Sequence, residues 1–456
     1  AITSLRAIGD ADWPDIIARV STLMQLMLGS TVFATEDTLT RDLSLHAIER
    51  LARNSGQSEV AVAQVLLSHM APASQADDPS SVPTYWLCGA GKPALLRALG
   101  QDPRAARAWA FVTRYLALPL YLGILMLCLG LLLWLLLQPS PQMSGWLLLL
   151  LGALAIFPAS EAVVAVTNRI ISESTRPQHL PRLALADGIP AGQRVMVVIP
   201  GMLTAPGSAH DLAHRLHLHY LANPEREAQF ALLTDWGDAE TAHTAKDSGY
   251  LADAVAQIEA LNASLPPQAA LGAPRFIVLH RPRQFSQTEQ RWIGWERKRG
   301  KLEALVAALA TGHSTAFTDC GEASRMAADV RYIVTLDADT QLPPGSLREL
   351  VGVAAHPYNQ PQLDATGQRV VAGYGILQPR VAAPLPERNE ATLYHWLFAG
   401  QCGMDTYSAA SSEVYQDLFA QGTFTGKGLL NVQAMHAVLH NRLPEGQVLS
   451  LIHISE

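Results

Sequence analysis

The segment Tyr332-Ile-Val-Thr-Leu-Asp-Ala-Asp339 joins a run of strand-forming residues to a pair of carboxylates. Tyr332 to Leu336 is aromatic, aliphatic or β-branched throughout, as is typical of a strand buried on both faces of a parallel sheet. Thr340 to Gly345 contains Pro-Pro-Gly, which predicts a loop. Asp337 and Asp339 are therefore expected at the carboxyl end of a strand, where open α/β sheets bind ligands.

Two carboxylates at a strand end can share one divalent cation with a bound diphosphate. Hard oxygen ligands suit Mg²⁺ or Mn²⁺, and such a cation would offset the charge of a leaving nucleoside diphosphate. An Asp-x-Asp triplet also arises by chance, and the alternative is a pair of solvated loop carboxylates. The strand before the triplet leads us to expect Asp339 and Asp337 as metal ligands.

Further apolar runs of strand length alternate with helical stretches from residue 185 onward. Helices are predicted over Ser248–Leu261 and Thr288–Leu309. This alternation predicts an α/β fold, with a mostly parallel sheet and flanking helices. The additional predicted strands are Val195–Ile199, Phe230–Thr234, Phe276–Leu279 and Val370–Leu377.

Two of these predicted strands lead into residues suited to a nucleotide. Val195–Ile199 is followed by Pro200-Gly201, which indicates a first nucleotide-binding loop. Phe230–Thr234 is followed by Asp235-Trp236-Gly237-Asp238, which holds a second pair of carboxylates. The segment Arg297-Lys298-Arg299-Gly300-Lys301 predicts a basic helix start able to approach phosphates. Taken alone, such a basic cluster is more often a solvated face.

Two long apolar runs precede this region. Tyr115–Leu137 carries no charged residue, and about 23 helical residues cross a hydrocarbon layer of ~30 Å. A second run, Met143–Val166, follows Gln138–Gln142 and has Glu161 as its one ionisable residue. We expect a transmembrane helical hairpin, because helices satisfy their own backbone in lipid. The alternative, a buried hairpin in a soluble core, fits such uniform apolar character poorly.

Basic residues flank the predicted hairpin on both sides and are absent from its turn. The positive-inside rule therefore predicts that both flanks are cytoplasmic. Trp134 and Trp146, near the far ends of the two runs, fit interfacial anchoring. The basic residues are Lys92, Arg97, Arg104, Arg107 and Arg114 before the hairpin, and Arg169, Arg176 and Arg182 after it.

Three parts are expected: a helical N-terminal segment (1–110), the transmembrane hairpin (111–170) and a cytoplasmic α/β domain (185–456). The formal net charge of -7 and the lack of Lys/Arg-rich runs argue against a nucleic-acid partner. The four cysteines form no CxxC pair, so neither a disulfide framework nor a zinc site is predicted. No secretory signal is seen at Ala1, and the chain looks like a piece of a longer protein.

The order of these features resembles the A-type inverting glycosyltransferases, which include cellulose and hyaluronan synthases. Those proteins have a first strand entering a loop, an aspartate near the base, a Gly-Lys helix and then Asp-x-Asp. Longer motifs are similar to those of cyclic β-1,2-glucan synthases, and this resemblance extends to about Leu449. The motifs are Tyr85-Trp86-Leu87, Pro158-Ala-Ser-Glu161, Tyr332-Ile-Val-Thr-Leu-Asp-Ala-Asp-Thr-Gln-Leu-Pro-Pro-Gly345, Gly373-Tyr-Gly-Ile-Leu-Gln-Pro-Arg380 and Phe424-Thr-Gly-Lys-Gly428.

The resemblance implies inverting transfer of glucose from UDP-glucose, building a β-1,2-glucan that the full-length protein later cyclises. It also implies a multi-pass protein of the bacterial inner membrane, whose partners are UDP-glucose, the growing glucan chain and the lipid bilayer. Carried over by position, Asp235 lies against the uracil, Asp337 lies near the ribose and diphosphate, and Asp339 binds the metal. Asp238 and Lys301 are further expected members of the nucleotide pocket.

The sequence departs from the family pattern after Val448-Leu449-Ser450. In the family a stretch containing His-Asp follows, whose acidic residue resembles the general base, and an Arg/Trp-rich segment and further membrane helices come later. Leu451–Glu456 follows here instead, and His453 has no matching surroundings. We expect the general base beyond Ser450 and an inactive fragment.

Two alternatives to a cyclic glucan synthase stay open. One is a linear polysaccharide synthase of the same fold, with another sugar or linkage. The other is a catalytically incomplete membrane scaffold that only binds nucleotide sugar. The long N-terminal helical segment and the early hairpin favour the cyclic glucan synthase.

Overall fold

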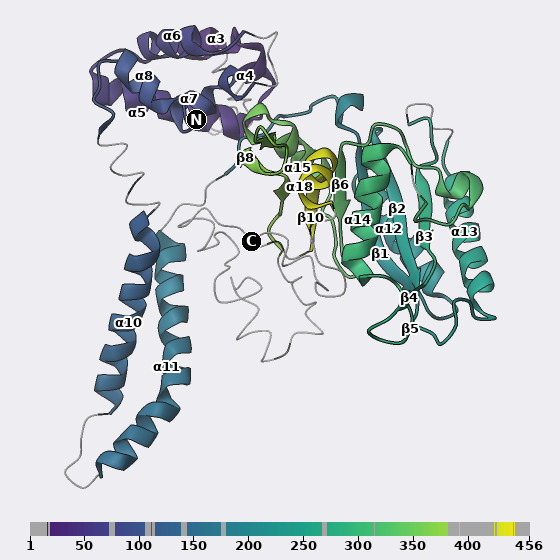
Figure 1. Cartoon of the computed structure of the whole chain (residues 1–456). Coiled ribbons are helices and arrows are strands. Elements are labelled where there is room, and N and C mark those ends of the chain that lie inside the picture. Colours follow the sequence, from purple (N-terminus) through teal and green to yellow (C-terminus); the bar gives the residue numbers. More distant parts are fainter. Residues whose placement is uncertain are drawn as a thin grey trace, which may run out of the picture. The chain divides into compact units, whose positions relative to one another are not determined.

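A computed structural model describes the chain in two compact units (Figure 1). The sheet unit comprises the described residues within Ala1–Gln101, Leu180–Pro379 and Phe424–Glu456, and the hairpin unit comprises those within Asp102–His179 and Arg380–Thr423. The residues that the structure describes are 16, 19–72, 78–104, 111, 115–137, 144–174, 179–266, 271–313, 315–381, 392, 424, 426–440 and 442.

A six-stranded mixed sheet forms the centre of the sheet unit, in the order β3-β2-β1-β6-β10-β9. The neighbours β3, β2, β1 and β6 are parallel, whereas β10 is antiparallel to both β6 and β9. The predicted α/β fold with a mostly parallel sheet is therefore confirmed. The strands are β1 (Val195–Leu203), β2 (Ala228–Trp236), β3 (Phe276–Arg281), β6 (Tyr332–Thr335), β9 (Ile376–Leu377) and β10 (Gly428–Asn431).

Helices cover both faces of this sheet (Figure 1). Successive strand residues point to opposite faces, so Val195 and Val197 pack into one core layer while Met196 and Val198 pack into the other. Because both faces are buried, the strands have near-continuous apolar sequences. Helices α12 (Ser208–Ala222), α13 (Asp247–Ala263) and α15 (Ser346–Ala355) cover the first layer, and α14 (Arg297–Thr311) and α18 (Val432–Leu439) cover the second.

Two predicted strands end later than expected. β1 continues through Pro200-Gly201 to Leu203, so the predicted first loop is still strand and stays paired with β2. β2 likewise includes Asp235 and Trp236, both buried. The prediction that Asp235 follows the strand was wrong, because Arg281 on the neighbouring β3 neutralises Asp235 within the sheet.

The prediction of one strand over Val370–Leu377 was also wrong. β8 (Val370–Ala372) pairs with β7 (Gln362–Leu363) in a separate two-stranded sheet, and only β9 joins the main sheet. Gly373 separates β8 from β9, with a left-handed φ of 70°. A Cβ there would lie 1.9 Å from the carbonyl oxygen of Gln360, so this break requires glycine.

The helix predicted over Thr288–Leu309 is correct only in its second part. Its first part falls in an antiparallel hairpin of β4 (Gln284–Ser286) and β5 (Arg291–Ile293). Gln290 has a left-handed φ of 52°, which interrupts any helix at this point. α14 therefore begins only at Arg297.

The described residues of the N-terminal segment are helical, as predicted. Serine or aspartate side chains cap several of these helices, and Gly56, in the left-handed region, ends α5. The helices are α3 (Thr22–Leu28), α4 (Thr31–Thr35), α5 (Thr38–Ser55), α6 (Glu59–His69), α7 (Pro83–Leu87) and α8 (Lys92–Ala98). Short 3₁₀ turns occur at Pro79–Ser81, Ala191–Gln193, Gly321–Ser324 and Pro357–Asn359.

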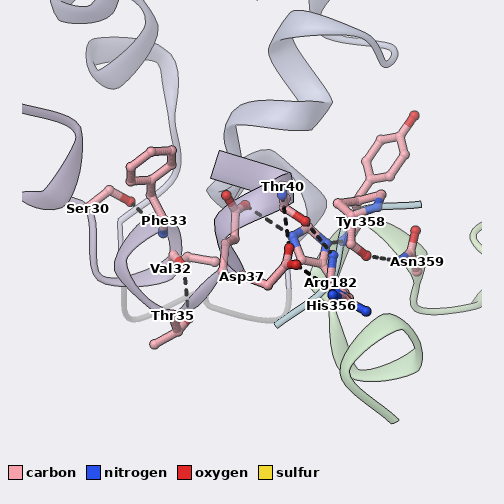
Figure 2. A network of polar contacts seen from close by, with 12 residues as sticks. Ser30, Val32, Phe33, Thr35, Asp37, Thr40, Arg182, His356, Tyr358 and Asn359 are labelled. Carbon is pink, nitrogen blue, oxygen red and sulfur yellow. Dashed lines mark hydrogen bonds and ion pairs between the residues drawn. The ribbon is translucent and has the colours of Figure 1, made fainter. Parts of the chain in front are cut away.

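A polar junction ties the N-terminal helices to the region after the apolar helices (Figure 2). Asp37 accepts a hydrogen bond from Arg182 Nε at 2.8 Å. Glu36 forms an antiparallel bridge with Leu183, and its Oε1 lies 3.1 Å from His356 Nε2. Glu36 and His356 are fully buried, and burial raises the pKa of Glu36. Residues more than 140 positions apart thus form one structural unit.

The hairpin unit contains α10 (Ala117–Leu136) and α11 (Gly145–Ser174), which lie side by side (Figure 1). Ala117–Leu136 and Gly145–Ile171 are long and apolar enough to cross a membrane, with mean hydropathies of 2.3 and 2.2. Most of their large apolar side chains are exposed, and Tyr121 donates a hydrogen bond to Asn168 across the pair at 2.7 Å. The predicted pair of apolar helices is confirmed, while Gln138–Gln142 lies outside the described residues.

Candidate functional site

The strand order reverses at β1, which lies between β2 and β6. The helices after β1 and β2 cover one face, whereas α14, which leads toward β6, covers the other. Such a switch point leaves a crevice beyond the carboxyl ends of the strands, where ligands bind in open α/β sheets. The first turn of α14 lies at this edge, because the chain reaches it from the carboxyl end of β3.

A buried ion-pair cluster lies where β2 ends. Arg281 on β3 binds Asp235 in a bidentate manner, with Nε–Oδ1 at 2.9 Å and Nη2–Oδ2 at 3.0 Å. Lys301 Nζ lies 3.3 Å from the same Oδ2 and donates to the carbonyl oxygen of Gly201 at 2.7 Å. All three charged side chains are buried, and burial lowers the pKa of Lys301 while Asp235 opposes that shift. This cluster fixes the first turn of α14 against β1 and β2.

A second, more exposed cluster surrounds Asp337 just beyond β6. Lys298 Nζ bonds to Asp337 Oδ1 and donates to the carbonyl oxygen of Gly426 at 2.8 Å. Lys427 Nζ lies 3.2 Å from Asp337 Oδ2. The side chains of Lys298, Lys427 and Asp337 are 28%, 18% and 36% exposed. Each oxygen of the carboxylate therefore has its own ammonium partner, and solvent reaches the group.

The other two predicted carboxylates lie apart from these clusters. Asp238 pairs with Arg297 Nη2 at 3.0 Å, and Asp339 is exposed in the turn after Asp337. Among the described residues, no group of three or more His, Cys, Asp or Glu side chains is arranged to hold a metal. Mg²⁺ is commonly held by one or two carboxylates together with substrate phosphates. Asp337 and Asp339 are two carboxylates separated by one residue just beyond β6.

The basic residues at the start of α14 have different partners and therefore different roles. Glu296 and Arg297 have left-handed φ values of 50° and 46°, an uncommon conformation for residues other than glycine. Arg299 is buried and binds Glu296 and Glu303 with N–O distances of 3.1 and 2.8 Å. It therefore holds the helix start together, while Lys298 and Lys301 extend to Asp337 and Asp235.

A buried histidine supports the β2–β3 side of the site. His280 Nδ1 lies 2.9 Å from Thr234 Oγ1, and its ring contacts that of Trp236 edge-on at a centroid distance of 4.0 Å. Burial lowers the pKa of His280 to about 4, so it is neutral at pH 7. Burial alone would raise the pKa of the nearby Asp247. Hydrogen bonds from Arg283 and Thr244 outweigh this effect and lower the pKa to about 2.

The structure brings Asp235, Lys301 and Asp337 to one edge of the sheet, but in two clusters. The sequence did not indicate Arg281, His280 or Lys427 as site residues, and it predicted Lys298 only as part of a basic helix start. A polar residue within an apolar strand, such as Arg281 at the end of β3, was the available signal. The expected general base beyond Ser450, like His453, lies outside the described residues.

A cavity of about 860 Å³ lies at the opposite edge of the sheet. It is lined by residues at the end of α14, before β6 and at the end of β10, among them Gly312, Arg331 and Asn431. None of the predicted site residues contributes to it. The candidate site is therefore identified by its charged side chains and not by a cavity.

Comparison with known proteins agrees with the motifs. No family model matches the chain. Over 98% of its length the chain is 35% identical to the cyclic beta-(1,2)-glucan synthase NdvB of Rhizobium meliloti (strain 1021), and it spans 16% of that protein's length. The resemblance to cyclic β-1,2-glucan synthases is thereby confirmed, and it extends over nearly the whole chain but over only about a sixth of NdvB.

Proposed function

We propose that this chain, as a fragment of a cyclic β-1,2-glucan synthase, is the donor-binding part of a membrane glucosyltransferase that uses UDP-glucose. In this proposal the sheet unit is an A-type glycosyltransferase domain, and the complete protein transfers glucose with inversion to a growing β-1,2-glucan. The similarity to NdvB supports glucan synthesis. The strand order supports the domain type, since it reverses where a nucleotide would bind.

The observation that carries this proposal is the convergence of Lys298, Lys301, Asp235 and Asp337 at the carboxyl edge of the sheet. A nucleoside diphosphate needs cationic groups for its phosphates and a cation that bridges it to the protein. Lysines from the first turn of α14 and its backbone N–H groups supply positive charge at this edge. Asp337, the first of the two carboxylates that follow β6, lies beside Lys298.

Each site residue has a defined task in the proposal. Asp235 and Asp238 border the nucleoside, and Lys301 maintains the edge of that pocket through Asp235 and Gly201. Asp337 and Asp339 would hold Mg²⁺ or Mn²⁺. When bound, the cation supplies positive charge that offsets the phosphates of the leaving UDP.

The proposal is tested by metal-dependent donor binding to the purified chain in detergent. Equilibrium dialysis with radiolabelled UDP-glucose should show binding that Mn²⁺ strengthens and a chelator weakens. We expect Asp339→Ala to remove the dependence on Mn²⁺, because it deletes a ligand. Glu259→Ala, at an exposed position of α13, removes the same charge and should behave as wild type. Undiminished Mn²⁺ dependence in Asp339→Ala would refute the metal assignment.

The same two variants also test the proposed activity of the complete protein. In the full-length synthase, Asp339→Ala should abolish glucosyl transfer from UDP-glucose, scored as protein-bound and released radiolabelled glucan. Glu259→Ala should transfer normally. Normal glucan synthesis by Asp339→Ala at limiting metal would contradict the proposed function.

A further inference from the structure

We propose that Lys298 and Lys427 occupy, before the donor binds, the positions around Asp337 that a divalent cation takes afterwards. Binding of the donor then exchanges partners: the two ammonium groups move to the diphosphate, and the carboxylate is released to the metal. This inference rests on the proposed function and concerns the same site. It assigns a role to two lysines that the motifs leave unassigned.

The first argument is the arrangement of charge. Asp337 offers one negative charge, and it faces two ammonium groups, one on each carboxylate oxygen. The cluster therefore has an excess positive charge, which favours an anion. Lys298 comes from the first turn of α14, whose N-terminal end adds to the positive potential. Lys427 comes from the opposite side, just before β10.

The second argument is competition for the same oxygens. A divalent cation that binds Asp337 would lie within a few ångströms of both ammonium groups. Like charges a few ångströms apart repel each other, and a divalent cation doubles the repulsion that a single charge would cause. Without a nucleotide, the lysines should therefore keep metal affinity low. A diphosphate removes this repulsion because it offers both ammonium groups new partners.

The third argument is that these groups are able to move. The pairs around Asp337 are partly exposed, whereas those around Asp235 are buried. Lysine carries its charge on a flexible four-carbon stem that can reorient toward a phosphate. Lys298 also donates to the carbonyl oxygen of Gly426, an additional partner that it would exchange for a phosphate.

The exchange makes metal and nucleotide binding mutually dependent. Since coupling between two ligands is reciprocal, UDP should tighten Mn²⁺ binding by the same factor by which Mn²⁺ tightens UDP binding. Such coupling is typically about 5–150-fold. A site in which the lysines only bind phosphate differs in one respect: their removal would weaken UDP binding and leave the affinity for Mn²⁺ alone unchanged.

The test measures free Mn²⁺ by electron paramagnetic resonance as the full chain in detergent is titrated, with and without UDP. For Lys427→Gln we expect Mn²⁺ alone to bind several-fold tighter, UDP to bind about tenfold weaker, and the coupling factor to shrink. Lys92→Gln on α8 is the matched control, because it removes the same charge in the N-terminal helices. It should reproduce the wild-type values.

Asp337→Asn provides a second variant with the opposite expectation. It releases both lysines, so metal-free UDP should bind more tightly than in wild type while Mn²⁺ no longer strengthens it. If Lys427→Gln weakens UDP binding but leaves the affinity for Mn²⁺ alone unchanged, the exchange is overturned and the proposed function stands. If wild type binds UDP neither with nor without Mn²⁺, both proposals fail.

Discussion

At the scale of single residues, burial separates the two charged clusters of the site. Asp235, Arg281 and Lys301 are almost fully buried, and removing one partner of such a buried pair typically costs about 3–5 kcal/mol. Asp337 and its lysines are partly exposed, so their pairing is weaker and can be exchanged. We therefore regard the first cluster as support for the site and the second as the part that responds to ligand.

His280 provides a pH-dependent test of the supporting side. Burial lowers its pKa to about 4, from an ordinary value of 6.5. The unfolded chain therefore binds more protons between these two values, and the free energy of unfolding falls as pH decreases from 6.5 to 4. His280→Phe should remove a pH-dependent loss on the order of 3 kcal/mol.

The measurement is urea unfolding of the purified chain at several pH values from 7 to 4, followed by tryptophan fluorescence. His313→Phe, at an exposed position after α14, is the control and should keep the wild-type pH dependence. Equal slopes for His280→Phe and wild type would show that this histidine is not the titrating group.

At the scale of elements, the strands were predictable because burial on both faces gives continuous apolar runs. Their ends were not predictable, because Asp235 stays within β2 only through Arg281 on the neighbouring strand. The β4–β5 hairpin was missed because its strands are only three residues long and are exposed or half-buried, so they carry no core pattern.

The site was predictable as a set of strand ends, but its pairings were not. Lys427 reaches Asp337 across 90 positions of sequence, and no local spacing reveals such a contact. Asp337, Asp339 and Lys301 were found because each lies in a short motif beside an apolar run. Their roles as ligands of metal and nucleotide stay predictions.

The contribution of the first turn of α14 to nucleotide binding can be tested by adding one methyl group at Gly300. A Cβ at Gly300 would lie 2.3 Å from the carbonyl oxygen of Trp295, so Gly300→Ala must displace the turn that carries Lys298 and Lys301. We expect UDP affinity to fall at least tenfold, corresponding to about 1.4 kcal/mol. Isothermal titration with UDP in the presence of Mn²⁺ measures this.

Gly249→Ala is the matched control for that change. Gly249 lies in the first turns of α13, and a Cβ there meets nothing within 4 Å. Alanine in a helix should stabilise this position by about 0.5–1 kcal/mol relative to glycine and leave UDP affinity unchanged. Equal UDP affinities for the two alanine variants would show that the close approach at Gly300 is not needed for binding.

At the scale of the whole molecule, the two apolar helices are inserted between parts of one compact unit. The described residues up to Gln101 and those within Leu180–Pro379 belong to the same unit. If both helices cross the bilayer, their outer ends return to one side of it. The basic flanks predict that this side is the cytoplasm, where a nucleotide-sugar donor would be available.

Reporter fusions to the full chain test this topology. Reporters at the N-terminus and at Gly192 should report the cytoplasm, and one at Ser140, between the two apolar runs in sequence, should report the opposite side. A reporter at Gly192 found outside the cytoplasm would disprove the topology. It would also separate the proposed donor site from cytoplasmic UDP-glucose.

The junction of Glu36 and Asp37 with His356 and Arg182 has a consequence for synthesis of the protein. The N-terminal helices leave the ribosome first, yet their partners are translated only after both apolar helices. Until then Glu36 lacks its contact with His356. A nascent chain that inserts one apolar helix but not the other leaves the two halves of the junction on opposite sides of the bilayer. If both apolar helices cross the bilayer, completion of the junction would therefore require the insertion of both.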